Sequence, residues 1–241
     1  MGLRTSQSIL ATILLSAFAV GAADVPESRR SRTVITRITP KLSAEARQKG
    51  LRLGSQIFLR IFKESKELEV WLRKEREFQL FKIYPIHTFS GQLGPKLKEG
   101  DRQAPEGFYY VPPSRMNPKS RFHLSFNLGY PNRYDRTHGR TGSALMVHGN
   151  TVSIGCFAMT DPLIEEIYTL ADAALRNDQK FFRVHIFPFR MTPKNMIRHQ
   201  DSEWSSFWQN LQQGYDFFER TKTPPDVLVH DMRYRFSLAP R

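Results

Sequence analysis

Apolar and polar residues alternate in the segment of the chain that begins near residue 55. Residues 55–62 and 67–73 each place an aliphatic side chain at every second position, and a polar stretch over 63–66 separates them. Alternation with a period of two is typical of a β-strand with one buried face. The pattern therefore predicts a β-hairpin, followed by a third strand over 77–86.

Further short apolar segments predict four more strands. They cover residues 108–111, 124–128, 145–147 and 181–187. Residues 91–115, between the third and fourth strands, are rich in glycine, proline and charge, which predicts an ordered functional loop or a lid over a site.

Helical spacing of apolar residues is confined to the second half of the chain. Asp161 and Pro162 provide an N-cap and a proline at the first helical position, and the apolar spacing continues to Arg176. A second helix is predicted over 202–220. Strands first and helices later indicate an α+β domain dominated by antiparallel sheet.

The first residues predict export. Arg4 precedes an apolar or small run over 9–20, and Gly21-Ala22-Ala23 follows it. A run of 12 residues is shorter than the roughly 20 needed to cross a bilayer, so residues 1–23 are interpreted as a cleavable signal peptide. The alternative is an uncleaved signal that anchors the protein to the membrane.

The charge of the chain changes its meaning in an exported protein. Lys and Arg number 36 against 23 Asp and Glu, a formal net charge of +13. Export argues against nucleic acid as a partner and favours anionic polymers, carboxylate-rich wall peptides or lipid headgroups. Residues 24–51 are interpreted as a solvated basic linker. Residues 226–241 form a C-terminal extension that either adds edge strands or remains a basic tail.

The only cysteine is the strongest candidate for chemistry. A single thiol excludes an intramolecular disulfide, a cysteine zinc cluster and a redox CxxC pair. Cys156 follows His148 by eight residues, and a thiol becomes a good nucleophile when an imidazole takes its proton. Gly155 would let the backbone approach a substrate carbonyl, and the N–H groups of residues 154–156, including that of Ile154, would form an oxyanion hole. The alternative is a buried structural cysteine beside a structural histidine.

Other polar residues are predicted to line a substrate cleft. His138 belongs to a second His-Gly pair, but it lies in a polar loop, whereas His148 ends a strand. A solvated loop is an equal interpretation of that region. The histidine, aspartate and glutamate positions show no metal-ligand spacing, so neither a metal nor another cofactor is predicted. The cleft candidates are His87, Asp135, Arg136, His138 and Gly149.

The segment from His148 to Cys156 resembles the active-site signature of the YkuD family of L,D-transpeptidases, in which His-Gly is followed by Ser-x-Gly-Cys. The resemblance is greatest to the YafK-like branch of the family and covers roughly residues 52–225. The segments that carry it are 90–96, 100–101, 105–109, 129–139, 153–159 and 188–192.

This resemblance implies a mostly antiparallel β catalytic domain over 52–225 with flanking helices, acting on peptidoglycan stem peptides in the periplasm. Such enzymes take the diaminopimelate carbonyl onto the cysteine as a thioester and pass it to an amine or to water. Cys156 matches the nucleophile and His148 the general base. Ser153 matches a serine that orients the pair, and Gly155, next to Ile154, matches the glycine of the oxyanion turn.

Three departures from the broader family bear on the reaction. Ile154 stands where the family has histidine, Ala158 stands where it has arginine, and the loop between His148 and Cys156 is short. The YafK-like branch shares these departures and implies hydrolysis of the link between peptidoglycan and an outer-membrane lipoprotein. An L,D-transpeptidase that forms 3-3 crosslinks or attaches lipoprotein is one alternative, and a non-catalytic wall-binding module is another.

Overall fold

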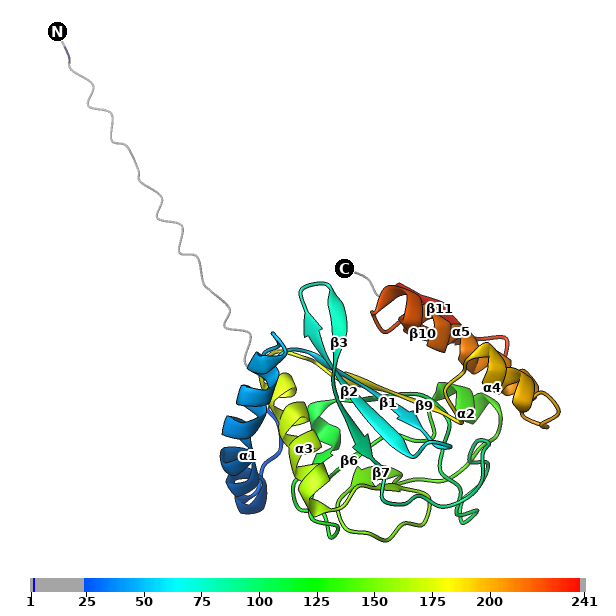
Figure 1. The fold of residues 1–241 in the computed structure, drawn as a ribbon, viewed down its shortest axis with the longest axis horizontal. Helices are drawn as coiled ribbons and strands as arrows, with labels where there is room; N and C mark the ends of the chain where they lie inside the picture. The colour runs from blue at the N-terminus through cyan, green and yellow to red at the C-terminus, as the bar shows by residue number, and fades with distance from the viewer. Residues whose placement is uncertain (1, 3–23, 239–241) are drawn as a thin grey trace.

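The computed structural model describes residue 2 and residues 24–238 (Figure 1). The predicted signal peptide therefore lies outside the described residues, apart from Gly2. Within the described part of the chain, no helix is both long and apolar enough to cross a membrane.

The main sheet has five strands in the order β3-β2-β1-β9-β4. Only β1 and β9 pair in parallel, and the other pairs are antiparallel. The alternating sequence pattern correctly predicted the first three strands, and the mostly antiparallel α+β class is confirmed. The strands are β1 (Ile57–Phe62), β2 (Glu67–Lys74), β3 (Glu77–Pro85), β4 (Gly107–Val111) and β9 (Phe182–Phe187).

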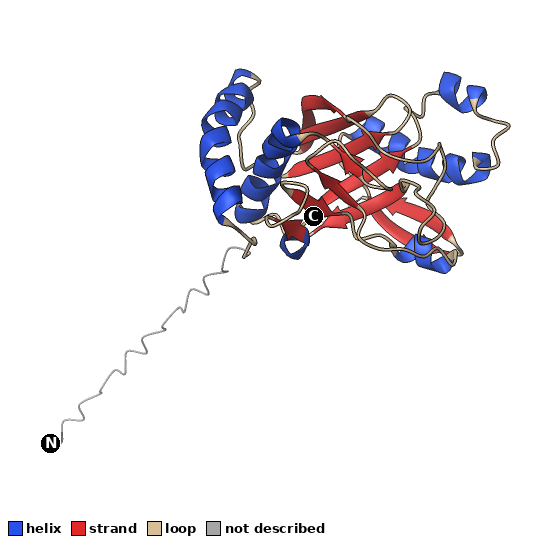
Figure 2. Cartoon of the chain, turned by 90° about the horizontal axis from the view of Figure 1, so that it is seen from below, coloured by secondary structure: helices blue, strands red, loops and turns tan. Residues whose placement is uncertain are grey.

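Both faces of this sheet are covered, which explains why all six residues of β1 are buried. Ile57, Leu59 and Ile61 belong to the core cluster that contains the apolar face of α3 (Asp161–Arg176). The alternate residues Phe58 and Phe62 pack instead with aromatic residues of α5 (Ser205–Thr221) and of the main sheet. Figure 2 shows the strands in the middle of the molecule, with helices on either side.

A second sheet of four short strands carries the candidate chemistry. Its order is β5-β6-β7-β8, with β7 and β8 parallel. Helix α3 contacts β1 of the main sheet as well as β6 and β7 of this one, so it holds the two sheets together. The short 3-10 helix Pro113–Arg115 precedes the strands β5 (Met116–Asn117), β6 (Ser125–Asn127), β7 (Met146–His148) and β8 (Phe157–Ala158).

The prediction of a solvated linker over 24–51 is wrong, because Arg29–Gln48 forms the helix α1. Ser28 caps its first turn in a reciprocal capping box with Ser31. One face buries Val34, Ile38, Leu42 and Ala46. That face packs against α3, where Arg37 and Lys41 reach Glu165 and Glu166, both at 2.5 Å. Helices are therefore not confined to the second half of the chain, and much of the basic charge here is paired.

The C-terminal extension continues the fold. β10 (Asp226–His230) and β11 (Arg233–Ser237) form a two-stranded antiparallel sheet of their own, which agrees with strands and not with a basic tail. Tyr234 of this hairpin is buried and stacks on Tyr134 with ring centroids 4.1 Å apart. The sequence patterns missed two short helices, α2 (Arg133–Thr137) and α4 (Pro193–Arg198).

Candidate active site

The small sheet brings Cys156 and His148 to one face. β7 and β8 are in parallel register, with His148 opposite Ala158. Residues directly opposite each other in a sheet project to the same side, and so do residues two apart on one strand. Cys156 immediately precedes β8 and lies two residues before Ala158, so alternation places its side chain on the face that carries His148. The predicted nucleophile and base thus face the same side of the small sheet.

His148 is held as the tautomer that a general base needs. Its ring is almost completely buried and stacks on Phe122 at 4.6 Å. Nδ1 lies 2.5 Å from the carbonyl oxygen of Gly149, which can only accept a hydrogen bond, so Nδ1 carries the hydrogen and Nε2 keeps its lone pair. Burial lowers the pKa of His148 below 6.5, although the Gly149 carbonyl opposes this shift. The imidazole is therefore neutral at neutral pH.

Cys156 rests as a neutral thiol. Its Sγ accepts a hydrogen bond from the backbone N–H of Met146 at 3.4 Å and donates one to the carbonyl of Ala144 at 3.7 Å. Burial raises the pKa of Cys156 above 9.0, while the Met146 N–H and the charge of Lys96 act in the opposite direction. If this thiol is to attack a carbonyl at neutral pH, a base has to take its proton during the attack, and a neutral imidazole can accept it.

The turn before Cys156 is fixed by side chains on both sides. The hydroxyl of Ser153 donates to the carbonyl of Cys156 at 2.6 Å, so Ser153 orients the turn and not the imidazole. Gly155 has φ +101°, a backbone conformation that favours glycine. The Gly155 N–H donates to Oγ of Ser90 at 2.5 Å. This N–H, predicted as an oxyanion donor, is therefore already engaged, while the neighbouring Ile154 side chain is 75% exposed.

The predicted functional loop lies beside this turn and is held by hydrogen bonds and a buried ion pair. Ala104 donates its N–H to the carbonyl of Ser90 at 3.0 Å. The ammonium of Lys63 reaches Glu106 at 2.9 Å and the carbonyl of Gly94 at 2.7 Å, and both charged side chains are 0% exposed. A buried ion pair thus fastens the loop to Lys63, the residue that directly follows β1.

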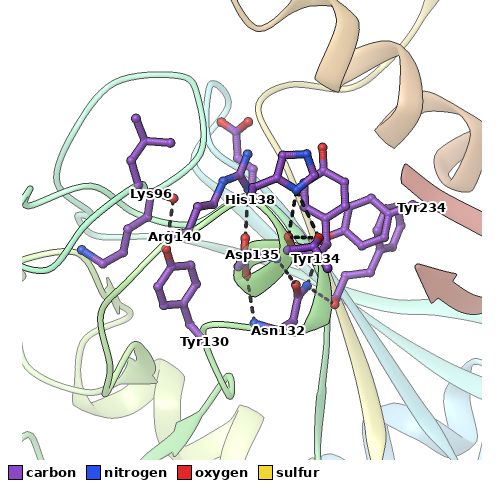
Figure 3. A network of polar contacts seen from close by, with 12 residues as sticks. Lys96, Tyr130, Asn132, Tyr134, Asp135, His138, Arg140 and Tyr234 are labelled. Atoms are coloured by element: carbon purple, nitrogen blue, oxygen red, sulfur yellow. Dashed lines mark hydrogen bonds and ion pairs between the residues drawn. The ribbon is translucent and has the colours of Figure 1, made fainter. Parts of the chain in front are cut away.

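The prediction that Asp135 lines the substrate cleft is wrong. Its side chain is fully buried and its oxygens accept hydrogen bonds from the Tyr109 hydroxyl at 2.9 Å, the Asn132 N–H at 3.0 Å and the Arg140 guanidinium at 2.9 Å (Figure 3). Burial raises the pKa of Asp135, and these hydrogen bonds oppose the rise. These three bonds tie α2 to the residues before and after it and to β4, so Asp135 stabilises the segment around α2.

Three other cleft candidates remain near or beyond that segment. His138 stacks on Tyr134 at 4.0 Å and bonds through Nδ1 to the Tyr134 carbonyl at 2.9 Å (Figure 3). Arg136 is exposed and bonds to the Pro131 carbonyl. His87 is exposed, and its backbone N–H donates to the carbonyl of Ala158 at 3.0 Å, which places it beside the nucleophile strand. A substrate role for these three stays a prediction.

Gly149 acts through packing and not through a substrate contact. It is buried, and an added Cβ would lie 2.6 Å from Oδ1 of Asp161 and 2.9 Å from both Ile164 and the Phe122 carbonyl. Only glycine fits there, and its own carbonyl fixes the ring of His148. The structure therefore corrects the predicted role of Gly149 from binding substrate to positioning the ring of His148.

Sequence reasoning missed two polar groups at the site. Ser90 precedes the Gly-rich loop and belongs to one of the segments that carry the family resemblance, but its residue type and position in the sequence indicate no role. Lys96 is only 4% exposed, and its ammonium donates to Asp101 at 2.5 Å and to the Lys98 carbonyl at 2.9 Å. Its charge is close enough to lower the pKa of the Cys156 thiol. A lysine in a polar loop carries no sequence signal that distinguishes burial from exposure.

Acidic, histidine and cysteine side chains are the protein groups that most often bind metal ions. Over residues 24–238, no group of three or more of them is placed to hold a metal ion. The expectation that the protein needs neither a metal nor another cofactor stays a prediction.

Two proteins of known sequence and several solved structures are similar to this chain. The chain is 44% identical over 196 residues to two proteins named "Putative L,D-transpeptidase YafK", one from Escherichia coli strain K12 and one from strain O157:H7. The matched residues are 81% of this chain and 79% of each relative. Among solved structures, the helical cell shape determining protein Pgp2 of Campylobacter jejuni matches with a TM-score of 0.45 and 19% identity over 83% of this chain and 80% of that one. Another Pgp2 structure matches with a TM-score of 0.45, and this chain covers 65% of that protein, which is less than two thirds of its length. Bd1075 of Bdellovibrio bacteriovorus matches with a TM-score of 0.40 and 18% identity, over 73% of this chain and 78% of that one.

The family assignment rests on the sequence matches. The model of the YkuD family, described as the L,D-transpeptidase catalytic domain, matches residues 61–186, which is more than half of the chain and includes both His148 and Cys156. Together with the identity to the two Escherichia coli proteins, this match shows that the chain belongs to the YkuD family of L,D-transpeptidases.

Proposed function

We propose that this protein is an exported, periplasmic cysteine enzyme that cleaves the amide between diaminopimelate of a peptidoglycan stem peptide and the C-terminal lysine of an outer-membrane lipoprotein. Family membership supports an enzyme that acts on peptidoglycan. The arrangement of Cys156 with a neutral His148, whose Nε2 keeps its lone pair, carries the proposal of a cysteine thioester. The apolar run over 9–20 supports export.

In the first half of the reaction, Sγ of Cys156 attacks the diaminopimelate carbonyl carbon. The S–C bond forms, the π electron pair moves to the carbonyl oxygen, and the thiol proton passes to Nε2 of His148. When the tetrahedral intermediate collapses, the C–N bond breaks and His148 protonates the departing lysine amine. The stem peptide is left on Cys156 as a thioester.

In the second half, water attacks the thioester while His148 accepts a proton from it. The C–S bond then breaks, a free diaminopimelate carboxyl group leaves, and the proton returns to the sulfur of Cys156. The same histidine serves as base and acid in both halves because Nδ1 keeps its hydrogen, donated to the Gly149 carbonyl, and leaves Nε2 to accept and return the proton.

The residues around the thiol support water as the acceptor. Ala158 is buried opposite His148 and supplies no charge, and Ile154 projects an apolar side chain into solvent. Lys96, whose charge lowers the pKa of the Cys156 thiol, is paired with Asp101. A site without a free cation at these positions offers little to hold the carboxylates of an acceptor stem peptide, which favours hydrolysis over crosslinking.

The test is to incubate the purified protein with sacculi that carry covalently bound lipoprotein and to measure soluble lipoprotein by immunoblot and mass spectrometry. The wild type should release lipoprotein that ends in a free lysine, and Cys156→Ala should release none. His148→Ala should lose most of the activity, whereas the control His230→Ala, whose side chain is 73% exposed, should not. Absence of release by the wild type would refute the proposal, and new 3-3 crosslinks in the muropeptides would identify a transpeptidase instead.

A further inference from the structure

The Ser90 hydroxyl contacts the backbone of Gly155, the residue before Cys156, although more than 60 residues separate Ser90 from Cys156 in the sequence. Thr88 forms an antiparallel bridge with Ala158, and their backbone N–H and carbonyl groups exchange hydrogen bonds at 2.9 and 3.3 Å. Continuing this register by two residues places Ser90 opposite Cys156. The rings of Phe89 and Phe157, the intervening pair, lie 5.8 Å apart as this register requires. Opposite residues project to the same face, so Ser90 and Cys156 share the reactive face.

The hydroxyl of Ser90 is used only as an acceptor. It accepts the N–H of Gly155 at 2.5 Å, and among the hydrogen bonds of residues 24–238 its own hydrogen has no acceptor. A serine hydroxyl has one hydrogen to donate and two lone pairs to accept. Accepting a bond from an amide strengthens a hydroxyl as a donor. Ser90 is only half-buried, so a substrate at Cys156 can reach this hydrogen.

We propose that Ser90 is a further catalytic residue, whose hydroxyl donates a hydrogen bond to the oxyanion that forms on the substrate carbonyl when Cys156 attacks. The inference rests on the proposed function, because it concerns the thioester step of that reaction. The Gly155 N–H acts on the oxyanion through Ser90, since it is already bonded to the Ser90 oxygen. No proton is transferred: the hydrogen stays on Oγ while the carbonyl π pair moves to oxygen, and the bond weakens again when the C–N bond breaks.

A purely structural role for Ser90 predicts a different behaviour. The Gly155 bond also holds the turn that carries the thiol, so losing Ser90 could disturb the thiol itself. Alkylation of Cys156 by iodoacetamide separates the two roles, because it needs a deprotonated sulfur and an open turn but forms no oxyanion. A residue that stabilises the oxyanion affects amide cleavage alone, whereas a residue that positions the turn affects both reactions.

The experiment compares wild type, Ser90→Ala, Ser90→Thr and the exposed-serine control Ser114→Ala in the full chain. Two rates are measured under single-turnover conditions: acyl-enzyme formation from a soluble stem peptide with lysine on its diaminopimelate carbonyl, followed by intact-mass spectrometry, and alkylation by iodoacetamide. Loss of one oxyanion donor typically lowers the rate about 10²–10³-fold. We expect a fall of this order for Ser90→Ala in acylation, an alkylation rate within about threefold of wild type, and recovery of acylation in Ser90→Thr.

Two results would overturn the inference: acylation by Ser90→Ala within about threefold of wild type, or an equal fall in both rates. Thermal unfolding of each variant shows whether a fall comes from misfolding, and a folded Ser90→Thr that acylates as slowly as Ser90→Ala also counts against the hydroxyl. Failure of the proposed function is a separate result. A wild type that acylates on the stem peptide but releases no lipoprotein from sacculi refutes lipoprotein hydrolysis and leaves the Ser90 comparison intact.

Discussion

The buried ion pair between Lys63 and Glu106 should dominate the stability of the loop beside the active site. Lys63 donates to Glu106, to Gly94 and to the Ala104 carbonyl at 3.2 Å, and Glu106 also accepts from the Gly94 N–H at 2.7 Å and Trp208 Nε1 at 2.8 Å. Both side chains are 0% exposed. Burial lowers the pKa of Lys63, and the Glu106 carboxylate opposes this shift. Lys63→Met removes the countercharge and leaves the carboxylate buried.

Leaving one buried charge without its partner costs about 3–5 kcal/mol in the free energy of unfolding. For a domain of this size each kcal/mol lowers Tm by about 2–4 °C, so Lys63→Met should lower Tm by about 6–20 °C. Lys63→Met combined with Glu106→Gln removes both charges while the glutamine oxygen still accepts from Gly94 and Trp208. The free energy of unfolding of the double variant should therefore be about 1–3 kcal/mol higher than the value expected if the losses of the two single variants simply added.

Urea unfolding of the four proteins of this cycle measures the coupling. Arg32→Met is the matched control, because it breaks an exposed pair with Glu27 whose side chains are 59% and 46% exposed and should cost less than about 1 kcal/mol. Ala104 also holds the Ser90 carbonyl, so the single variants should release lipoprotein more slowly than wild type. Additive losses, or a Lys63→Met protein as stable as Arg32→Met, would refute this account of the loop.

Three further predictions concern the base, its supporting glycine and the first helix. Burial lowers the pKa of His148 below 6.5, so the acid limb of the pH profile of kcat/KM should have its midpoint below that pH. A higher midpoint would contradict the buried environment of this ring. Gly149→Ala should cost about 1–3 kcal/mol and slow the reaction, since its Cβ has no room and would displace the carbonyl that holds His148; unchanged thermal unfolding and activity would disprove this. Leu42→Ala should cost about 2–5 kcal/mol because Leu42 is 0% exposed, whereas the exposed control Arg47→Ala should cost little; equal, small losses would restore the linker interpretation.

Local signals were sufficient for most of the main sheet and for α3. The alternation over 55–73 depends on neighbours along one strand, and the Asp161-Pro162 start of α3 depends on its own first turn, so both are visible in a single sequence. Residues 24–51 lacked such a clear signal. Pro40 lies inside α1, and abundant arginine and lysine suggested solvent. The decisive partners, Glu165 and Glu166, are on a helix more than 100 residues away.

The site was predictable where its chemistry depends on residue type, and unpredictable where it depends on long-range register. A lone cysteine after His148 made these two residues the candidates for nucleophile and base. The β7–β8 register puts both on one face of the small sheet, and their catalytic roles stay a prediction. Ser90 reaches Gly155, the residue before Cys156, next to the bridge between Thr88 and Ala158, which no local pattern reveals. Asp135 shows the opposite error: a polar segment looks like a solvated cleft, yet its polar groups are satisfied by one another inside the protein (Figure 3).

The neutral resting state of the thiol agrees with our proposal that the enzyme works outside the cytoplasm. A thiolate is the form that oxidants attack, so a cysteine with a raised pKa is protected between turnovers. The nucleophile must then be generated only when a carbonyl is in place, which requires a base with a free lone pair and a hydrogen-bond donor for the oxyanion. His148, fixed by Gly149, provides the first, and Ser90 in our proposal provides the second. The absence of an arginine two residues after the nucleophile, where Ala158 stands, then becomes part of the same arrangement: a nearby unpaired cation would favour the thiolate at rest.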